Sequence, residues 1–383
     1  MTKEDIKRFV QIHALVSYPP SNLNRDDLGR PKTAIMGGKE RLRISSQSMK
    51  RAWRDSKFFT DSFNGRIAPR TKLLGEYVFK ALTSGCTLSD VFDGKEDNPV
   101  NPKLDNDLAI TWAQIIAGVF ASVKPSKEDK NNLKAEQLVH ASHDEIILID
   151  RYIAEISKTR EIPKKDAKGT YDTLKKDLKK KLICYPYSDV DIALFGRMIA
   201  SSQENTVEAA AQVAHPITIH PVVVEDDYFT AVDDLNKIED NAGAGHVGTM
   251  EYGAGVFYTY VCINRELLIE NLGGDEELAN NAIKALVECV AMIGPKGKQA
   301  SFGSRVYASY MMVEQGNQQP RSLAAAFIDP KMYCDNYVLE GIEKLRDEKR
   351  RMDDVYGKCS DIVSEFSVPE GTGKLDDILK TIG

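Results

Sequence analysis

The chain has 383 residues, of which 42% are hydrophobic and 28% are charged, and its formal net charge is −6. This composition is ordinary for a soluble protein with a large buried core, and an acidic balance by itself argues against a nucleic-acid partner. No apolar run approaches the length of a membrane span, and the opening residues MTKEDIKRF lack the apolar core of a signal peptide. We therefore expect a cytoplasmic protein with no membrane partner.

The N-terminal region predicts a strand, a loop, a second strand and a helix. Residues Phe9–Ser17 alternate in polarity and are rich in β-forming residues, so they predict the first strand. A loop rich in proline, glycine and asparagine follows from Tyr18 to Lys39. The stretch Arg41–Arg54, RLRISSQSMKRAWR, then predicts a short basic strand that runs into a helix, with Ser46 as its N-cap.

Residues from about 60 to 185 differ in character, because helix-like patterns dominate there. Thr71–Thr83 and Asp107–Val123 are two such stretches. We predict a helical subdomain inserted at 60–185, between an N-terminal part at 1–59 and a C-terminal part at 186–383.

The C-terminal part predicts the rest of a sheet, with one protruding arm. We predict strands at Val190–Phe195, Val256–Ile263 and Val306–Val313, and helices at Asn205–Val213 and Glu276–Ile293. The segment at about 215–248 contains HPITIHPVVV, an acidic YFTAVDD and a glycine-rich NAGAGHVG, a composition typical of a protruding hairpin. The segment Gly294–Arg305, GPKGKQASFGSR, predicts a loop rich in glycine and lysine.

Without its insertions, this order of elements predicts an α+β fold with a β-α-β-β-α-β ferredoxin-like arrangement. The RNA recognition motif (RRM) also places a four-stranded sheet beneath its ligand. The chain has no clear counterpart of the paired aromatic stretches of that motif, so the sequence does not support base stacking on the sheet face.

The helix predicted after Ser46 has one polar face and one apolar face. The polar face carries Gln47, Lys50, Arg51 and Arg54, at positions i, i+3, i+4 and i+7. The apolar side chains are Met49, Ala52 and Trp53. Three cations on one face repel one another, and cations near a helix N-terminus oppose the macrodipole, so the pattern favours a bound polyanion. A solvated charged face is the alternative, and the spacing leaves it open.

Basic residues are concentrated in two segments of this acidic chain. Residues 25–54 contain nine Lys or Arg and three Asp or Glu, which gives 9 − 3 = +6. Residues 164–181 contain eight and three, which gives 8 − 3 = +5. Such a distribution allows local polyanion binding despite the negative total.

Five sequence blocks resemble one protein family. The longest, His13–Arg54, reads HALVSYPPSNLNRDDLGRPKTAIMGGKERLRISSQSMKRAWR. The others are VDIALFGRM from Val190, HPITIH from His215, YFTAVDDL from Tyr228 and GVFYTYVCIN from Gly255. In this order they resemble the CasC-type backbone subunit of the type I-E CRISPR Cascade complex, of the RAMP superfamily, over most of the chain except about 60–185 and the C-terminal tail.

This resemblance implies a modified palm, helical fingers at 60–185 and a β-hairpin thumb at about 215–248. It implies a non-catalytic subunit without a cofactor, several copies of which sheathe a CRISPR guide RNA and present it to target DNA. Other Cascade subunits and a separately recruited helicase-nuclease are the further partners implied. Candidate RNA contacts in the N-terminal segment are Arg25, Lys32, Lys39, Arg41, Arg43, Ser45, Ser46, Gln47, Lys50, Arg51 and Arg54.

Further RNA contacts are implied in the glycine-rich loop and the thumb. The loop supplies Lys296, Lys298 and Gln299, although a plain hairpin connection would have a similar composition. The resemblance implies that Met198 and Phe229, with Thr230, wedge against RNA bases, whereas core packing is the usual fate of such apolar residues. On the fingers, Lys168, Lys175, Lys176, Lys179 and Lys180 are implied to contact target DNA, and a solvated face is the alternative.

The adjacent carboxylates Asp26 and Asp27 are the main enzymatic alternative. Related backbone subunits carry a catalytic aspartate in an early loop, and two carboxylates can hold Mg²⁺, so a metal-dependent ribonuclease remains a competing hypothesis. A purely structural scaffold is a third. The histidines have no ligand spacing, and we expect His13 to be a packed strand residue. The six cysteines are scattered without a CxxC pair, so we expect reduced thiols and no metal site.

Overall fold

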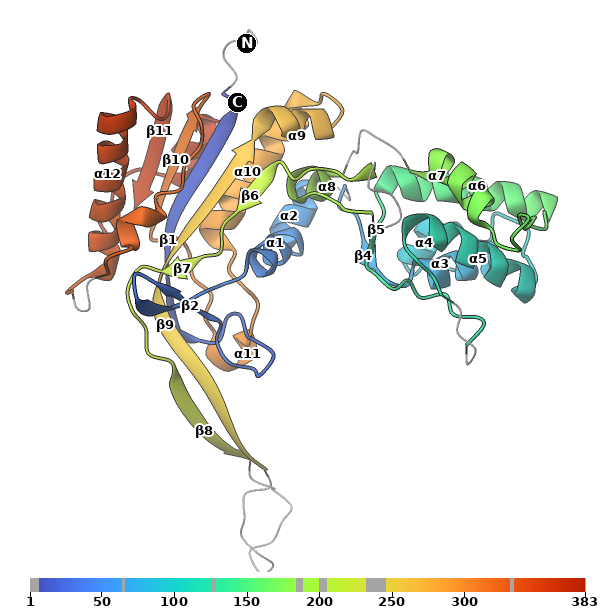
Figure 1. The fold of residues 1–383 in the computed structure, drawn as a ribbon, viewed down its shortest axis with the longest axis horizontal. Helices are drawn as coiled ribbons and strands as arrows, with labels where there is room; N and C mark the ends of the chain where they lie inside the picture. The colour runs from blue at the N-terminus through green and yellow to red at the C-terminus, as the bar shows by residue number, and fades with distance from the viewer. Residues whose placement is uncertain are drawn as a thin grey trace, which may run out of the picture. The chain divides into compact units, whose positions relative to one another are not determined.

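The computed structural model describes residues 7–63, 66–124, 129–183, 189–199, 205–231, 246–330 and 334–382. The chain divides into two compact units (Figure 1). Unit 1 comprises Met1–Ser62, Ala211–Arg265 and Asn280–Gly383. Unit 2 comprises Phe63–Ala210 and Glu266–Ala279. The helical unit thus extends past the insertion expected at 60–185, up to residue 210, and takes in a second short stretch.

Unit 1 is built on an antiparallel sheet. Its strands, in spatial order, are β11 (Ile362–Ser367), β10 (Tyr310–Gly316), β1 (Phe9–Ser21), β9 (His246–Asn264) and β6 (Ala211–Val213). Two more, β7 (Ile217–Thr218) and β8 (Glu225–Ala231), also pair with β9. In the central register, His13 of β1 lies opposite Met312 of β10 and Tyr260 of β9.

The sheet confirms the predicted ferredoxin-like arrangement. Along the chain the core elements are β1, α1 (Ser46–Arg54), β6, β9, α10 (Glu276–Met292) and β10. In space the four strands lie in the order β10-β1-β9-β6, with β11 added at the edge. This is the strand order of a β-α-β-β-α-β unit, in which each helix connects two strands that are not neighbours.

The second core strand was assigned to the wrong residues by sequence. Val190–Phe195 forms helix α8, and five of its six residues are buried. The strand at this place in the topology is β6, within the stretch Asn205–Val213 for which a helix was expected. A short run that is apolar all round has no period to distinguish a buried strand from a buried helix, so the two elements were interchanged.

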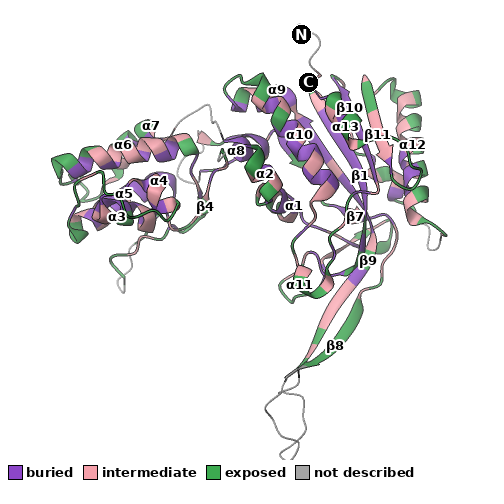
Figure 2. Cartoon of the chain, turned by 180° about the vertical axis from the view of Figure 1, so that it is seen from behind, coloured by how far each residue is buried: buried purple, intermediate pink, exposed green. Residues whose placement is uncertain are grey.

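Strand β1 lies at the centre of the sheet, and both of its faces are buried. Val10, Ile12 and Ala14 are buried on one face, and His13 and Leu15 on the other. Figure 2 shows most of β1 in the colour of buried residues. The buried site of His13, within 2.8 Å of the Tyr258 hydroxyl, confirms that it is a packed strand residue.

Helices cover the two faces of the sheet. On one face lies α12 (Tyr337–Tyr356), where a Cβ on Gly341 would come within 2.9 Å of Leu15. Helices α1 and α10 lie on the opposite side (Figure 1). The remaining elements of unit 1 are β2 (Thr33–Met36), β3 (Lys39–Leu42), α2 (Lys57–Ser62), α11 (Gln299–Phe302), η2 (Ala324–Phe327) and α13 (Leu375–Lys380).

Strands β8 and β9 extend beyond the sheet as a hairpin, as predicted for the thumb. The described part pairs Glu225 with Tyr252 and continues to Ala231 opposite His246. Phe229 lies opposite Gly248, and a Cβ on that glycine would lie 2.5 Å from the tip of the Phe229 ring. The ring therefore covers glycine backbone across the hairpin. The remainder of YFTAVDD and most of NAGAGHVG lie outside the described residues.

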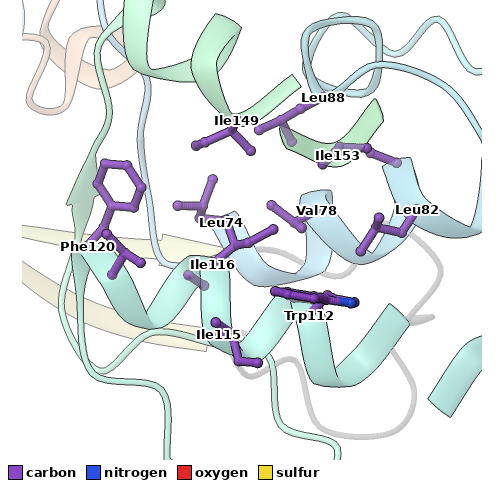
Figure 3. Packing of buried hydrophobic residues seen from close by; sticks show 14 of the residues in the cluster. Leu74, Val78, Leu82, Leu88, Trp112, Ile115, Ile116, Phe120, Ile149 and Ile153 are labelled. Atoms are coloured by element: carbon purple, nitrogen blue, oxygen red, sulfur yellow. The ribbon is translucent and has the colours of Figure 1, made fainter. Parts of the chain in front are cut away.

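Unit 2 is helical, as predicted. Its elements are α3 (Leu74–Ser84), α4 (Leu88–Phe92), α5 (Asn106–Phe120), α6 (His143–Thr159), α7 (Asp172–Leu182), α8, α9 (Arg265–Asn271) and the strand pair β4 (Arg70–Thr71) and β5 (Val139–His140). Its core includes Leu74, Val78, Trp112, Ile116 and Ile149, which interdigitate in Figure 3. Among the described residues, no helix has the length and apolar character needed to cross a membrane.

Candidate nucleic-acid interface

Helix α1 begins one residue earlier than its predicted cap implies. The N-cap is Ser45, whose hydroxyl accepts a hydrogen bond from the Ser48 amide at 3.3 Å, whereas Ser46 is the first helical residue. The Ser45 amide in turn donates to the Asn24 side-chain oxygen at 2.8 Å. These contacts fix the loop at Asn24 beside the start of the helix, and they engage a hydroxyl that the sequence assigned to RNA.

The apolar face of α1 anchors the helix against the end of α10. Met49, Ala52 and Trp53 are buried, as predicted. The Trp53 indole N–H donates to the Ile293 carbonyl at 3.1 Å. Since Ile293 directly precedes the loop Gly294–Arg305, this hydrogen bond places that loop next to the polar face of α1.

Glycines allow the loop after α10 to approach the end of β1 closely. A Cβ on Gly297 would lie 2.2 Å from the Leu23 carbonyl oxygen, and one on Gly294 would lie 2.6 Å from the Tyr18 hydroxyl. The loop is also attached to α1, because the Lys296 ammonium donates to the Asp55 carbonyl at 3.0 Å. Its glycines thus serve contact with the protein's own backbone.

Three adjoining hollows in unit 1 lie where α1 meets the loop Gly294–Arg305. We call them together the basic groove. The central hollow has a volume of about 700 Å³. Its lining brings together the two segments predicted to bind RNA, with Arg25 and Arg51 from the first and Lys296 and Lys298 from the second. The second hollow, of about 550 Å³, shares Arg25 and Lys298 and reaches Phe229. The third, of about 800 Å³, shares Lys296 and is also lined by Lys57, Arg305 and Tyr307.

The central hollow also contains carboxylates, and two of them are engaged in structure. The Asp26 carboxylate accepts from the amides of Leu28 and Arg30, both at 2.9 Å, and so closes the turn of its own loop. Asp55 pairs with Arg51 at 3.2 Å. Asp27 is exposed on the same loop.

The base of the thumb is fixed to the same loop. The Arg30 guanidinium donates to the Glu251 carboxylate at 2.6 Å, and the Asn22 amide donates to the Glu251 carbonyl at 2.9 Å. Both contacts are made by Glu251 of β9, so the loop is attached to the strand that lines the second hollow opposite Phe229.

The prediction for Arg41 is wrong, because this side chain does not reach the surface. It is fully buried, and its terminal nitrogens donate to the carbonyls of Thr218 at 2.7 Å and Phe327 at 3.0 Å. Burial lowers the pKa of the guanidinium. Arg41 is a structural tie between the β2–β3 hairpin and the segments that carry its two acceptors.

The other predicted cations of the N-terminal segment differ in accessibility. Arg51 and Arg54 both pair with Asp55, at 3.2 and 3.1 Å, but 81% of the Arg51 side chain is exposed and only 16% of the Arg54 side chain. Burial lowers the pKa of Lys50. Lys39 and Gln47 are exposed, and Ser46 is half-buried.

Arg43 and Lys32 form a second positive patch with His215. The Arg43 guanidinium lies 2.8 Å from the His215 Nδ1 atom. Burial and the charges of Arg43 and Lys32 lower the pKa of His215. The patch therefore keeps His215 neutral at neutral pH, with its ring nitrogen accepting from Arg43.

The remaining predicted contacts lie at several places. Met198 is 74% exposed on unit 2, and Phe229 is 41% exposed on the thumb with Thr230 next to it. The Gln299 amide group donates within its own loop, to the Pro295 carbonyl and the Ser304 hydroxyl, both at 3.1 Å.

The fingers lysines lie on and before α7 of unit 2. Lys168, Lys176 and Lys180 are exposed, and Lys179 is half-buried. The stem of Lys175 lies against Gly118 of α5, where a Cβ would meet it at 2.8 Å.

Among the cations and aromatic residues that line the groove, the sequence prediction missed Arg30, Lys57, Arg305 and Tyr307. Arg30 lies inside the basic segment 25–54, and Arg305 ends the glycine-rich loop. Lys57 is the first residue of α2, and the helical spacing of α1, which ends at Arg54, gave no signal for it. Tyr307 had no signal, because a lone tyrosine in a strand pattern predicts core packing.

The described residues contain no group of three or more His, Cys, Asp or Glu side chains that could hold a metal ion. Asp26 and Asp27 form only a pair, and one of them is engaged by backbone amides. The arrangement of the groove suits the binding of an extended anion, with cations from three segments along its length.

Comparisons with known proteins agree with this architecture. A family model described as "CT1975-like protein" matches residues 10–378. The chain is similar to a chain of a solved "CRISPR RNA-guided surveillance complex, pre-nicking", with a TM-score of 0.78, 29% identity, and coverage of 98% of this chain and 100% of that one. A chain of a "CRISPR RNA-guided surveillance complex" has the same fold, with a TM-score of 0.57, 24% identity, and coverage of 97% and 99%. No curated protein matched the sequence.

Proposed function

We propose a function for this chain from the premise that it belongs to the CT1975-like protein family. The chain acts as the backbone subunit of a type I-E Cascade surveillance complex and sheathes its guide RNA without cutting it. Several copies assemble head to tail along one guide in the cytoplasm, together with other Cascade subunits. The covered guide pairs with target DNA, and a separate helicase-nuclease is recruited for cleavage.

The observation that carries this proposal is the basic groove. Two segments that are about 240 residues apart in sequence, around Arg51 and Lys296, line one hollow because Trp53 joins α1 to the end of α10. Neighbouring hollows extend it in two directions. Cations along such a path bind successive phosphates and contribute affinity that does not depend on base identity, which is what a subunit must have to coat guides of any sequence.

The thumb supports a second element of the proposal. Phe229 lines one hollow of the groove from the hairpin, and 41% of this apolar side chain is exposed there. Inserting such a ring between bases costs a few kcal/mol of unstacking and returns about 1–3 kcal/mol by stacking. We propose that Phe229, with Met198 and Thr230, displaces guide nucleotides at regular intervals.

The fingers lysines support contact with target DNA. Lys168, Lys176 and Lys180 of unit 2 are exposed to solvent, and Lys179 is partly exposed. A duplex carries closely spaced phosphates, so a few surface lysines on one helix are sufficient for a weak, sequence-independent contact.

We infer that the subunit is not a nuclease, in preference to a metal-dependent ribonuclease using Asp26 and Asp27. The Asp26 carboxylate already accepts two backbone amides, which reduces its capacity for a metal. The assay is incubation of the purified chain with target RNA and Mg²⁺. Cleavage that Asp26→Ala or Asp27→Ala abolishes would replace this proposal with the ribonuclease.

The test of RNA binding is a pair of matched double variants. Arg51→Ala with Lys296→Ala removes two groove cations, whereas Arg350→Ala with Lys380→Ala removes two exposed cations that also pair with aspartates, at 2.9 and 3.1 Å. The groove variant should bind single-stranded RNA roughly tenfold more weakly for every sequence. Its slope of log K against log salt should be smaller by about 1.4, from about 0.7 per lost phosphate contact.

The control variant should bind like the wild type. An unchanged salt slope in the folded groove variant contradicts phosphate binding in the groove. A loss confined to particular sequences contradicts it too, because that outcome indicates base recognition. Sequencing the RNA that co-purifies with the assembled complex then identifies the guide.

A further inference from the structure

The hollow at Tyr307 differs from the other two in the chemistry of its walls. It is shared by apolar side chains and cations, and among the described residues that line it there is no carboxylate. Tyr307 itself is 71% exposed. The apolar part consists of Met292, Ile293, Pro295, Val306 and Tyr307, and the cations are Lys57, Lys296 and Arg305.

Tyr307 is held on a firm part of the fold. The next residue, Ala308, donates its amide to the Ala291 carbonyl of α10 at 2.7 Å, and Ser309 donates to the Leu15 carbonyl of β1 at 2.9 Å. The backbone that carries the ring is thus attached to both the helix and the central strand. Only the ring projects, so a ligand that stacks on it would meet a preorganised surface.

The composition of the walls selects the class of ligand. A site for phosphate alone needs cations and gains nothing from an apolar floor. A protein partner with an apolar face would leave Lys57, Lys296 and Arg305 without counter-charges in the interface. A nucleotide of single-stranded RNA satisfies both parts, because its base is a flat apolar surface and its flanking phosphates are anions.

The hollow is also continuous with the groove that the proposed function assigns to RNA. Lys296 lines both this hollow and the central one. A strand whose phosphates pass Arg51 and Lys296 therefore reaches Tyr307 without leaving the protein surface.

We infer that Tyr307 is a base-stacking platform for single-stranded RNA, with Lys57 and Arg305 on the flanking phosphates. This inference rests on the proposed function and adds an aromatic contact at the end of the groove away from Phe229. Stacking accepts every base, since each has a π-face, so the platform binds RNA without selecting its sequence.

The experiment compares two probes on the full-length chain: a labelled oligouridine RNA, and an abasic ribose-phosphate oligomer of the same length. Tyr307→Ala should weaken oligouridine binding roughly 5- to 150-fold, which corresponds to about 1–3 kcal/mol per stacked base. Binding of the abasic oligomer and the salt slope should be unchanged, because no phosphate contact is lost. Tyr307→Phe should retain wild-type binding, since it keeps the ring.

Tyr356→Ala is the matched control, because Tyr356 is 81% exposed in unit 1 and lines none of the three hollows. Equal oligouridine binding by wild type and Tyr307→Ala overturns the inference. An equal loss on both probes overturns it as well, because the defect then concerns the phosphate contacts or the loop. A changed sedimentation coefficient of RNA-free Tyr307→Ala identifies the hollow as a protein interface, which also overturns it. If the wild type binds neither probe, the proposed function fails, whatever Tyr307 does.

Discussion

The two basic segments of this chain look alike in sequence, but the fold uses their charges differently. Residues 25–54 have a surplus of +6 (nine basic and three acidic), and residues 164–181 have +5 (eight and three). In the first segment Arg41 is buried, Arg54 is largely covered and Ser45 caps a helix. In the second, Lys176 and Lys180 remain exposed on α7. A count of charges therefore overstates the binding surface of the first segment more than that of the second.

The cause of the difference is the position of each segment in its unit. The first crosses a hairpin and the start of a helix, and both must be attached to the central sheet, so several polar groups are used for that attachment. Most of the second lies on one amphipathic helix, α7, whose buried side chains are Leu178 and Leu182. Lys176 and Lys180 remain exposed on this helix, and the three lysines at its C-terminal end also suit the helix dipole.

The largest expected effect is on protein stability, and it tests whether the buried Arg41 of the first segment has a structural role. Arg41→Ala should lower the free energy of unfolding by about 3–5 kcal/mol, because it leaves a cavity and removes the donor from two buried carbonyls. Lys39→Ala, two residues earlier on the same strand and exposed, should change it by less than about 0.5 kcal/mol. Chemical denaturation measures both. A stable Arg41→Ala protein that has lost RNA binding would show that Arg41 contacts RNA after all.

The next prediction tests whether the exposed lysines of α7 bind DNA. Lys176→Ala with Lys180→Ala should weaken binding of double-stranded DNA by the assembled complex roughly tenfold, and reduce the salt slope by about 1.8, from about 0.9 per phosphate contact on a duplex. Guide-RNA binding and thermal stability should be unaffected. Arg350→Ala with Lys380→Ala serves as the control here too. Loss of guide RNA from the α7 variant would contradict the assignment of these lysines to DNA.

Removing the N-cap of α1 should have a smaller effect on stability. Ser45→Ala should lower the free energy of unfolding by about 1 kcal/mol, since it removes the acceptor for the Ser48 amide. Ser46→Ala, at the first helical position, should cost much less. Neither substitution should change the salt slope of RNA binding. A lower RNA affinity of Ser45→Ala at fixed ionic strength, in protein that unfolds at the wild-type denaturant concentration, would return this hydroxyl to the RNA contacts.

The sequence was sufficient to predict the fold class, the helical unit, the thumb hairpin and the place of the two basic regions. It could not exclude Arg41, because alternation within a four-residue strand gives too short a pattern to show which side faces inward. It also interchanged α8 and β6, since α8 is a short buried run without a period and β6, with three residues, is too short to show one. The exposure of Tyr307 could not be predicted from the sequence, because it depends on how the chain leaves the loop and joins β10.

The smallest expected effect concerns the patch of Arg43, Lys32 and His215. Arg43 and Lys32 are half-buried, between the buried Arg41 and the exposed lysines of α7. Burial and the two cations lower the pKa of His215, so in the free protein the ring is neutral above its ordinary value of 6.5 and stays neutral somewhat below it. The unfolded chain binds the proton more readily, and the contribution of His215 to stability is therefore lost as pH falls below about 6.5. A phosphate bound beside Arg43 would have the opposite effect on the ring, because it favours the imidazolium and raises its pKa.

RNA binding at this patch should therefore take up protons and strengthen roughly two- to threefold between pH 8 and pH 5.5, in wild type but not in His215→Gln. Titration of labelled RNA at fixed ionic strength measures it, with His143→Gln, on α6 of unit 2, as the control histidine. An equal pH dependence in wild type and His215→Gln would mean that no phosphate approaches this patch. Arg43 and Lys32 would then join Arg41 among the charges that the first segment uses for its own structure, and the RNA path would be confined to the basic groove.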